Sequence, residues 1–302
     1  MRIPLFLLAS FPSLALAGVA EAAPQPLGTI WQNGRDAVVV TPCPPGGDTD
    51  AYCRAVEVRQ GEKVTPLGTG YMVVTPLWIA SSPASTPTLV VLGDNGGSGS
   101  LGDLFVISLT PELAIRRLRD ERMDSVAVRS DGASPAFELP FDIEFFNGAP
   151  HAGAVIVKLP VRWKAGPQGG DFALDFRAMV GPPPSAEQLE TQAAAMRQEL
   201  AEWARDKHAV TRLYPPEASA GTPVTVQTLA DLVLSGHADL ARDLLHRAWP
   251  RNAGHRLEGE NAFWTALCTV IARHPLWKRL ALDQLPHPEL IIVVARAQIP
   301  SQ

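Results

Sequence analysis

The sequence has few charged residues and no excess of basic ones. Its 302 residues include 26 Lys and Arg against 31 Asp and Glu, which gives a net charge of −5. Proteins that bind nucleic acid through its phosphates need a concentrated basic surface. The composition therefore argues against nucleic acid as a partner.

The sequence also lacks an apolar run long enough to cross a membrane. Its most apolar stretch, Ile3–Leu16, has about 14 residues where a spanning helix needs about 20. The stretch follows Met1-Arg2 and ends on the small-residue triplet Ala15-Leu16-Ala17, with a second triplet, Ala20-Glu21-Ala22, downstream. This order is typical of a secretory signal peptide, and a membrane anchor is the alternative. We expect residues 1–22 to be a signal peptide, and the mature chain to be periplasmic or secreted without a membrane span.

Cysteine is scarce, with Cys43, Cys53 and Cys268 the three in the chain. An exported protein meets an oxidising compartment, where disulfides persist. Cys43 and Cys53 flank the turn-forming sequence PPGGDTDAY, which can bring them together, so we expect a disulfide between them. Cys268 lies in an apolar, helical context and is expected to be a buried thiol. A catalytic thiol is the alternative.

The front half is rich in short apolar runs separated by Gly, Pro, Asn and Asp, a pattern typical of strands. We expect about nine strands between residues 28 and 178. They should be mostly antiparallel, because few connections are long enough for helical crossovers. The segment Pro111-Glu112-Leu113 can form either a short helix or a turn, and the sequence does not decide between them. The runs are 37–41, 52–58, 71–75, 88–92, 104–109, 125–128, 137–146, 153–159 and 172–176.

Gly181-Pro182-Pro183-Pro184 marks a boundary, because consecutive prolines continue neither a ladder nor a helix. Ser185 and Gln188 then match a capping box. An apolar stripe follows at spacings of four and three, which predicts a buried face on a helix of about 20 residues. The stripe consists of Leu189, Ala193, Met196, Leu200 and Trp203.

Three more helices are expected, at about 222–235, 238–249 and 261–273, with Pro223 at a helix start and Gly236 at a helix end. The predicted fold class is α+β, with an antiparallel β domain over 23–180 and a helical bundle over 181–302.

The segment Gly97–Gly102 matches the dinucleotide fingerprint G-x-G-x-x-G. A working fingerprint must open a helix whose N-terminus holds the pyrophosphate. Leu104–Leu109 follows instead, with the pattern of a strand, so we interpret the segment as a Gly/Ser turn and expect no cofactor. Ser98 and Ser100 do not match the hydrolase elbow G-x-S-x-G.

Metal ligation by His237, Asp239 and His246 is the next candidate. Ligands on one helix face need spacings of three or four, and the two histidines are separated by more. We expect a helix-end histidine and a surface histidine, and no metal.

Oxygen-rich side chains give two further candidates. Asp94, Asn95 and Asp103 flank the Gly-rich turn and offer calcium ligands, although without the alternation of a calcium loop. Asp142 and Glu144 alternate on one expected strand and share a face, as paired carboxylates of a glycoside hydrolase can. A solvent-facing pair is the alternative.

The stretch from Gly96-Gly97 to Leu109, continued by residues 125–146, resembles a family of uncharacterised exported bacterial proteins. Their β half looks like degenerate FG-GAP or VCBS repeats, the units of β-propellers. The Gly-Gly turn and Ile107-Ser108-Leu109 keep the family pattern. The family's Cys-Cys pair is absent, and its acidic loop is reduced to Arg129–Gly132, so no calcium ligands carry over. The resemblance implies a propeller-like β half.

Leu229–Arg242, continuing to Pro250, looks like the C-terminal segment of the same family. It also resembles part of one tetratricopeptide unit, with small and apolar residues at matching intervals. The resemblance implies a closely packed helix hairpin. The matching positions are Gly236, Ala241, Leu245 and Ala248.

These patterns together predict an exported, non-enzymatic protein that binds another protein or an envelope component. The alternative is a cell-envelope hydrolase with its site in the β domain, on carboxylates such as Asp142 and Glu144. A calcium-stabilised structural module is a third possibility.

Overall fold

The computed structural model describes most of the chain from residue 27 onward. The described residues are 27–44, 52–80, 88–96, 101–109, 112–120, 122–131, 134–143, 154–166, 169–205, 223–251, 259–286, 288 and 291. The expected signal peptide lies outside them.

The front of the described chain forms three four-stranded sheets, here named A, B and C. Sheet A contains β1 (Gly28–Asn33), β2 (Asp36–Pro42), β3 (Arg54–Gln60) and β4 (Lys63–Tyr71). Sheet B contains β5 (Val73–Ile79), β6 (Thr88–Asp94), β7 (Gly102–Ser108) and β8 (Ala114–Asp120). Sheet C contains β9 (Ala127–Asp131), β10 (Ser134–Ile143), β11 (Val155–Lys164) and β12 (Asp171–Leu174).

Helices form the back of the described chain. The α-helices are α1 (Phe176–Met179), α2 (Ala186–Arg205), α3 (Val224–Leu234), α4 (Ala238–Ala248), α5 (Glu260–Arg273) and α6 (Pro275–Arg279). Short 3₁₀ turns lie at η1 (Met123–Ser125) and η5 (Leu282–Gln284). The structure is thus α+β with antiparallel sheets, as expected. Within the described ranges, no helix has the length and apolar character that a membrane crossing requires.

Each sheet is a meander in which neighbours in sequence are neighbours in the sheet, and the strand pairs are antiparallel. The described residues form twelve strands where the sequence predicts about nine. The nine predicted runs each correspond mainly to one strand, and β1, β4 and β8 have no predicted run of their own. Pro66 interrupts the apolar pattern of β4, a sheet edge where proline's missing N–H is tolerated.

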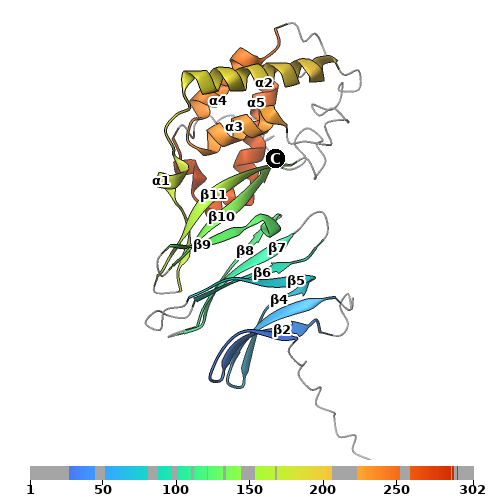
Figure 1. Cartoon of the computed structure of the whole chain (residues 1–302), viewed down its shortest axis with the longest axis vertical. Helices are drawn as coiled ribbons and strands as arrows, with labels where there is room; N and C mark the ends of the chain where they lie inside the picture. The colour runs from blue at the N-terminus through green and yellow to red at the C-terminus, as the bar shows by residue number, and fades with distance from the viewer. Residues whose placement is uncertain are drawn as a thin grey trace, which may run out of the picture.

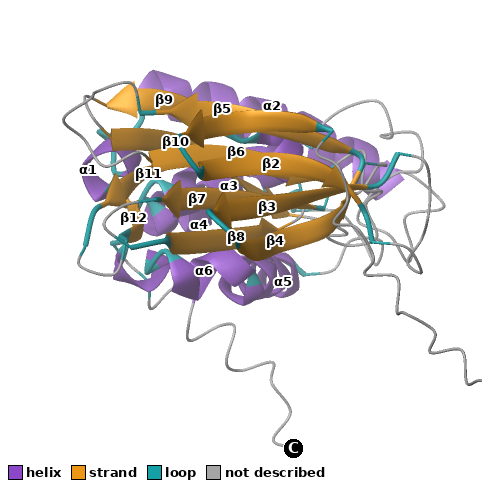
Figure 2. Cartoon of the chain, turned by 90° about the horizontal axis from the view of Figure 1, so that it is seen from below, coloured by secondary structure: helices purple, strands orange, loops and turns teal. Residues whose placement is uncertain are grey.

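The three sheets lie one above another, and the helices cover the far side of sheet C (Figure 1). Figure 2 looks through the stack and shows β2, β6 and β10 lying over one another, with β3, β7 and β11 beside them. Sheet B is covered on both faces, which explains why β6 and β7 have continuous apolar sequences.

Two apolar clusters hold this stack together. One joins sheets A and B, through residues such as Val56 and Phe105. The other joins the opposite face of sheet B to sheet C and the helices, through residues such as Val106, Leu159 and Leu229. Because the second cluster is continuous, the helices and sheet C share one core.

The start of α2 confirms the predicted capping box. The Ser185 N–H donates to Gln188 Oε1 at 2.8 Å, and the Gln188 N–H donates to Ser185 Oγ at 3.2 Å. The predicted stripe is also buried: Ala193, Met196 and Leu200 have no exposed surface. Sequence periodicity did not indicate α6, a single short turn that starts directly after α5 at Pro275.

Candidate binding groove

Asp142, one of the predicted paired carboxylates, is buried against a histidine. Its Oδ1 lies 3.0 Å from His274 Nε2, and both side chains are less than one-tenth exposed. His274 Nδ1 accepts the Leu276 N–H at 3.1 Å and so caps α6. An accepting Nδ1 places the ring hydrogen on Nε2, which donates to Asp142. Both ring nitrogens are therefore engaged, and the pair ties α6 to sheet C. Glu144 lies outside the described residues.

Asp103, a candidate calcium ligand, instead links sheets A and B. Its carboxylate accepts from Tyr71 Oη at 2.6 Å, from Arg117 Nε at 2.7 Å and from Arg117 Nη2 at 2.6 Å. Burial, reinforced by the Asp103 hydrogen bond, raises the pKa of Tyr71 above its ordinary range. The hydrogen bond to Asp103 raises the pKa of Arg117. Both oxygens of Asp103 thus have protein partners.

Among the other candidate metal ligands, Asp239 and His246 line one pocket together, and the rest lie elsewhere. Asp94 Oδ1 accepts the Gly96 N–H at 2.7 Å. His237 Nε2 lies 3.0 Å from the Gly181 carbonyl oxygen, at the start of α4. The His246 side chain is 76% exposed and pairs with Glu260. In the ranges that the structure describes, no three His, Cys, Asp or Glu side chains gather as a metal site would require.

The cysteines and the Gly-rich segment were also candidate sites in the sequence. Cys43 and Cys53 form a disulfide with Cα atoms 5.5 Å apart. Cys268 is buried in α5 outside any disulfide, and burial raises the pKa of its thiol to about 12. Residues 97–100, including Ser98 and Ser100, lie outside the described part, but Gly102 begins strand β7. The fingerprint-like segment therefore lacks the following helix that a pyrophosphate needs.

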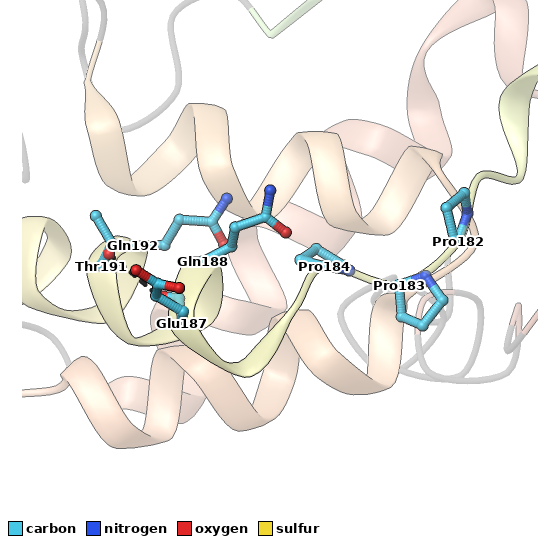
Figure 3. A pocket seen from close by; sticks show the side chains of 7 residues that line it. All are labelled: Pro182, Pro183, Pro184, Glu187, Gln188, Thr191 and Gln192. Carbon is cyan, nitrogen blue, oxygen red and sulfur yellow. Dashed lines mark hydrogen bonds between the residues drawn. The ribbon is translucent and has the colours of Figure 1, made fainter.

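Two pockets meet along the first turns of α2. The outer pocket, about 560 Å³, is lined by Pro182, Pro183, Pro184, Glu187, Gln188, Thr191 and Gln192 (Figure 3). The inner pocket, about 330 Å³, is lined by Val157, Lys158, Pro160, Ala178, Met179, Pro184, Gln192, Thr228, Asp231, Leu232 and Ser235. Pro184 and Gln192 line both pockets. We call the two together the α2 groove.

The local sequence explains how the groove is built. The capping box at Ser185 fixes the first turn of α2 directly after the three prolines, which cannot join that helix. Gln188 and Gln192 are four residues apart and therefore lie on one face of α2. Figure 3 shows their amides extending in the same direction, away from Glu187.

The polar groups of the inner pocket include both donors and acceptors of hydrogen bonds. Gln192 Oε1 is buried and receives no hydrogen bond from the described residues. The Asp231 carboxylate accepts from Gln227 Nε2 at 2.9 Å, and desolvation raises the pKa of Asp231 although much of its surface is exposed. Lys158 also lines this pocket, and its ammonium group donates to the Ser125 carbonyl oxygen.

The groove has the general character of a ligand site. Its inner pocket is enclosed by β11, α1, α2 and α3, where the sheets meet the helices, and most of its lining is apolar. Ligand sites are commonly found at such junctions, with a few polar groups on apolar walls. Sequence reasoning missed this groove because four separate elements contribute to it. The available signal was the three prolines directly before a capping box.

Comparison of the chain with protein-family models, with curated proteins and with solved structures found no match.

Proposed function

We propose that the chain is an exported, non-enzymatic binding protein of the cell envelope, and that it binds a protein or envelope component at the α2 groove. One observation carries this proposal: the groove combines apolar walls with one buried acceptor, Gln192 Oε1, that receives no hydrogen bond from the described residues. By contrast, the carboxylates of Asp103 and Asp142 accept hydrogen bonds from side chains of other strands or helices.

The finer architecture belongs to the same proposal. Each sheet is a four-stranded meander resembling a propeller blade, and the three lie in an open stack. We take 23–180 as the β domain and 181–302 as the helical domain. On that division the inner pocket lies between them, because β11 and α3 both line it. Fold analogy alone does not establish function.

A cell-envelope hydrolase is the second candidate, and the Asp142–His274 pair is the observation that favours it. A general base needs a ring nitrogen within reach of the proton it removes. His274 would have to release the Leu276 N–H before Nδ1 could act. We therefore place this function second.

Site-specific photo-cross-linking in the native envelope tests the proposal. A photoreactive residue replaces Thr191 in the groove or, as a matched control, Gln198, which lies further along α2 and bonds Glu202. The proposal predicts a reproducible adduct from position 191 and none from position 198. Equal labelling from both positions, or none from either, would contradict it.

A further inference from the structure

We infer that the partner at the α2 groove is a protein that presents tryptophan or tyrosine side chains to the segment Pro182–Pro184. This inference rests on the proposed function and specifies the chemistry of its partner. The segment joins α1 to α2, and its three prolines line the outer pocket (Figure 3). Pro182 and Pro183 are exposed, so a partner can reach their rings.

Covalent geometry fixes the conformation of this segment. A proline ring holds φ at about −65°, and a residue that precedes proline is driven to extended or polyproline II geometry. Gly181, Pro182 and Pro183 each precede a proline. Both ends are also held, because the Gly181 N–H donates to the Met179 carbonyl oxygen at 3.1 Å and the Ser185 N–H belongs to the capping box. The segment is therefore ordered before a partner arrives, and binding costs it little conformational entropy.

The backbone of the segment offers acceptors alone, because proline has no N–H. None of the donors in the described ranges bonds the carbonyl oxygens of Pro182, Pro183 or Pro184. A partner must therefore cover apolar rings and donate hydrogen bonds beside them. Tryptophan and tyrosine combine a flat apolar ring with an N–H or O–H donor, and grooves lined with aromatic side chains bind polyproline II segments.

The rest of the outer pocket favours a neutral partner. Among the residues that line it, Glu187 is the one charged side chain, and no Lys, Arg or His is present. A phosphate or carboxylate group would therefore lie near a like charge without a cation to pair with. The exposed Gln188 has its Oε1 engaged by the Ser185 N–H, which leaves its Nε2 group to donate to a main-chain carbonyl or a tyrosine hydroxyl. A volume of about 560 Å³ accommodates an aromatic side chain with part of its main chain.

Nuclear magnetic resonance of the mature chain with isotope-labelled proline tests the inference with three matched probes. N-acetyl-tryptophanamide has the indole ring and its N–H, its N-methylindole analogue lacks that N–H, and N-acetyl-leucinamide lacks the ring. We expect N-acetyl-tryptophanamide to shift the ring signals of Pro182 and Pro183 upfield, and to bind about fivefold more tightly than either other probe. The signals of Pro275, an exposed proline at the start of α6, should stay unchanged.

Proline variants separate recognition from folding. The double substitution Pro182→Ala with Pro183→Ala removes the exposed rings and should weaken N-acetyl-tryptophanamide binding about fivefold. Its melting temperature should fall only slightly, because alanine adds freedom to the unfolded chain, and the α2 signals should keep their positions. The control Pro275→Ala removes a lone exposed proline elsewhere and should leave the affinity unchanged.

The outcomes keep this inference distinct from the proposed function. Equal affinities for the three probes, shifts at Pro275 as large as those at Pro182, or an unchanged affinity after the double substitution would each overturn the aromatic-partner assignment. So would a cross-linked adduct from position 191 whose linked segment contains neither tryptophan nor tyrosine, although the groove would remain a binding site. If no probe shifts the segment, the assignment also fails, and cross-linking from position 191 still decides the proposed function independently.

Discussion

Two junctions of the molecule use polar groups in opposite ways. Between sheets A and B, Asp103 is buried and both of its oxygens have partners from other strands. Between sheet C and the helices, the Asp142–His274 pair is also buried, but in the α2 groove Gln192 Oε1 accepts no hydrogen bond from the part of the chain that the structure describes.

This difference distinguishes polar groups that hold the fold together from polar groups that can bind a ligand. A satisfied buried network fixes one arrangement of two sheets and offers a ligand nothing. A buried acceptor without a donor costs stability, and a bound molecule can remove that cost by supplying the donor. The A–B junction should therefore respond to substitution through stability, and the α2 groove through binding.

The largest stability effect should come from Asp103→Asn. The substitution weakens the hydrogen bonds that the buried carboxylate accepts from Tyr71 and Arg117. Hydrogen bonds to a charged group contribute about 2 kcal/mol each, and those from Arg117, which is 41% exposed, are partly screened by water, so we expect a loss of about 4 kcal/mol. Urea unfolding followed by circular dichroism measures the loss.

The control for Asp103→Asn is Glu190→Gln, which breaks the surface pair with Arg197. It should leave the unfolding midpoint unchanged, because exposed ion pairs contribute little. Similar midpoints for the two variants would show that the Asp103 network does not hold the sheets together.

His274→Ala should have the next largest effect. It removes the α6 cap, worth about 1 kcal/mol, and leaves the Asp142 carboxylate buried without its donor, at a cost of about 2 kcal/mol. His274→Asn is the matched variant, because Asn also caps helices and should recover the stability that the α6 cap contributes. If the Asn and Ala variants unfold at the same denaturant concentration, His274 does not act as a cap.

Gly93→Ala should follow, through steric crowding at the A–B junction. A Cβ at position 93 would lie 2.7 Å from the ring of Tyr71, which is fully buried. Overpacking of this kind costs about 2 kcal/mol. Gly28→Ala in β1 is the control, since its Cβ would meet nothing within 4 Å. Thermal unfolding of the two variants should differ, and equal melting temperatures would contradict this packing.

The smallest effect should be a pH dependence from Asp175. The Arg162 side chain holds the pKa of this carboxyl below its ordinary value. The contribution of this carboxyl to the free energy of unfolding is therefore fully present above its unfolded-state pKa. It is lost as the pH falls through the lower folded-state pKa. Since Arg162 is 56% exposed, Arg162→Gln should remove only about 0.5 kcal/mol at neutral pH. The parent and variant should converge in acid, and a gap that widens as pH falls would contradict the assignment.

Local signals in the sequence predicted the helical half well. Ser185 and Gln188 form the capping box at the start of α2, and Gly236, with φ of +83°, lies just after the end of α3. These features depend on residues a few positions apart, so sequence alone contains them.

Contacts between distant residues could not be predicted in the same way. Asp142 and His274 are separated by 132 positions, and only the packing of α6 on sheet C brings them together. In the sequence, nothing distinguishes Gln192 from the other polar residues of an amphipathic helix. Its significance depends on β11 and α3, which enclose it. The sequence predicted antiparallel strands but not their grouping into three meanders, because β1, β4 and β8 had no predicted run of their own and Pro66 interrupts the pattern of β4.

Hydrogen–deuterium exchange of the mature chain, with and without a solubilised cell-envelope fraction, tests the central claim most directly. We predict slower exchange in residues 184–192 and 228–235, which contain lining residues of the α2 groove, and unchanged exchange in residues 66–71, 102–109 and 112–117 of sheets A and B. Protection confined to the A–B junction, or none in the groove, would contradict the claim that the groove is the binding site.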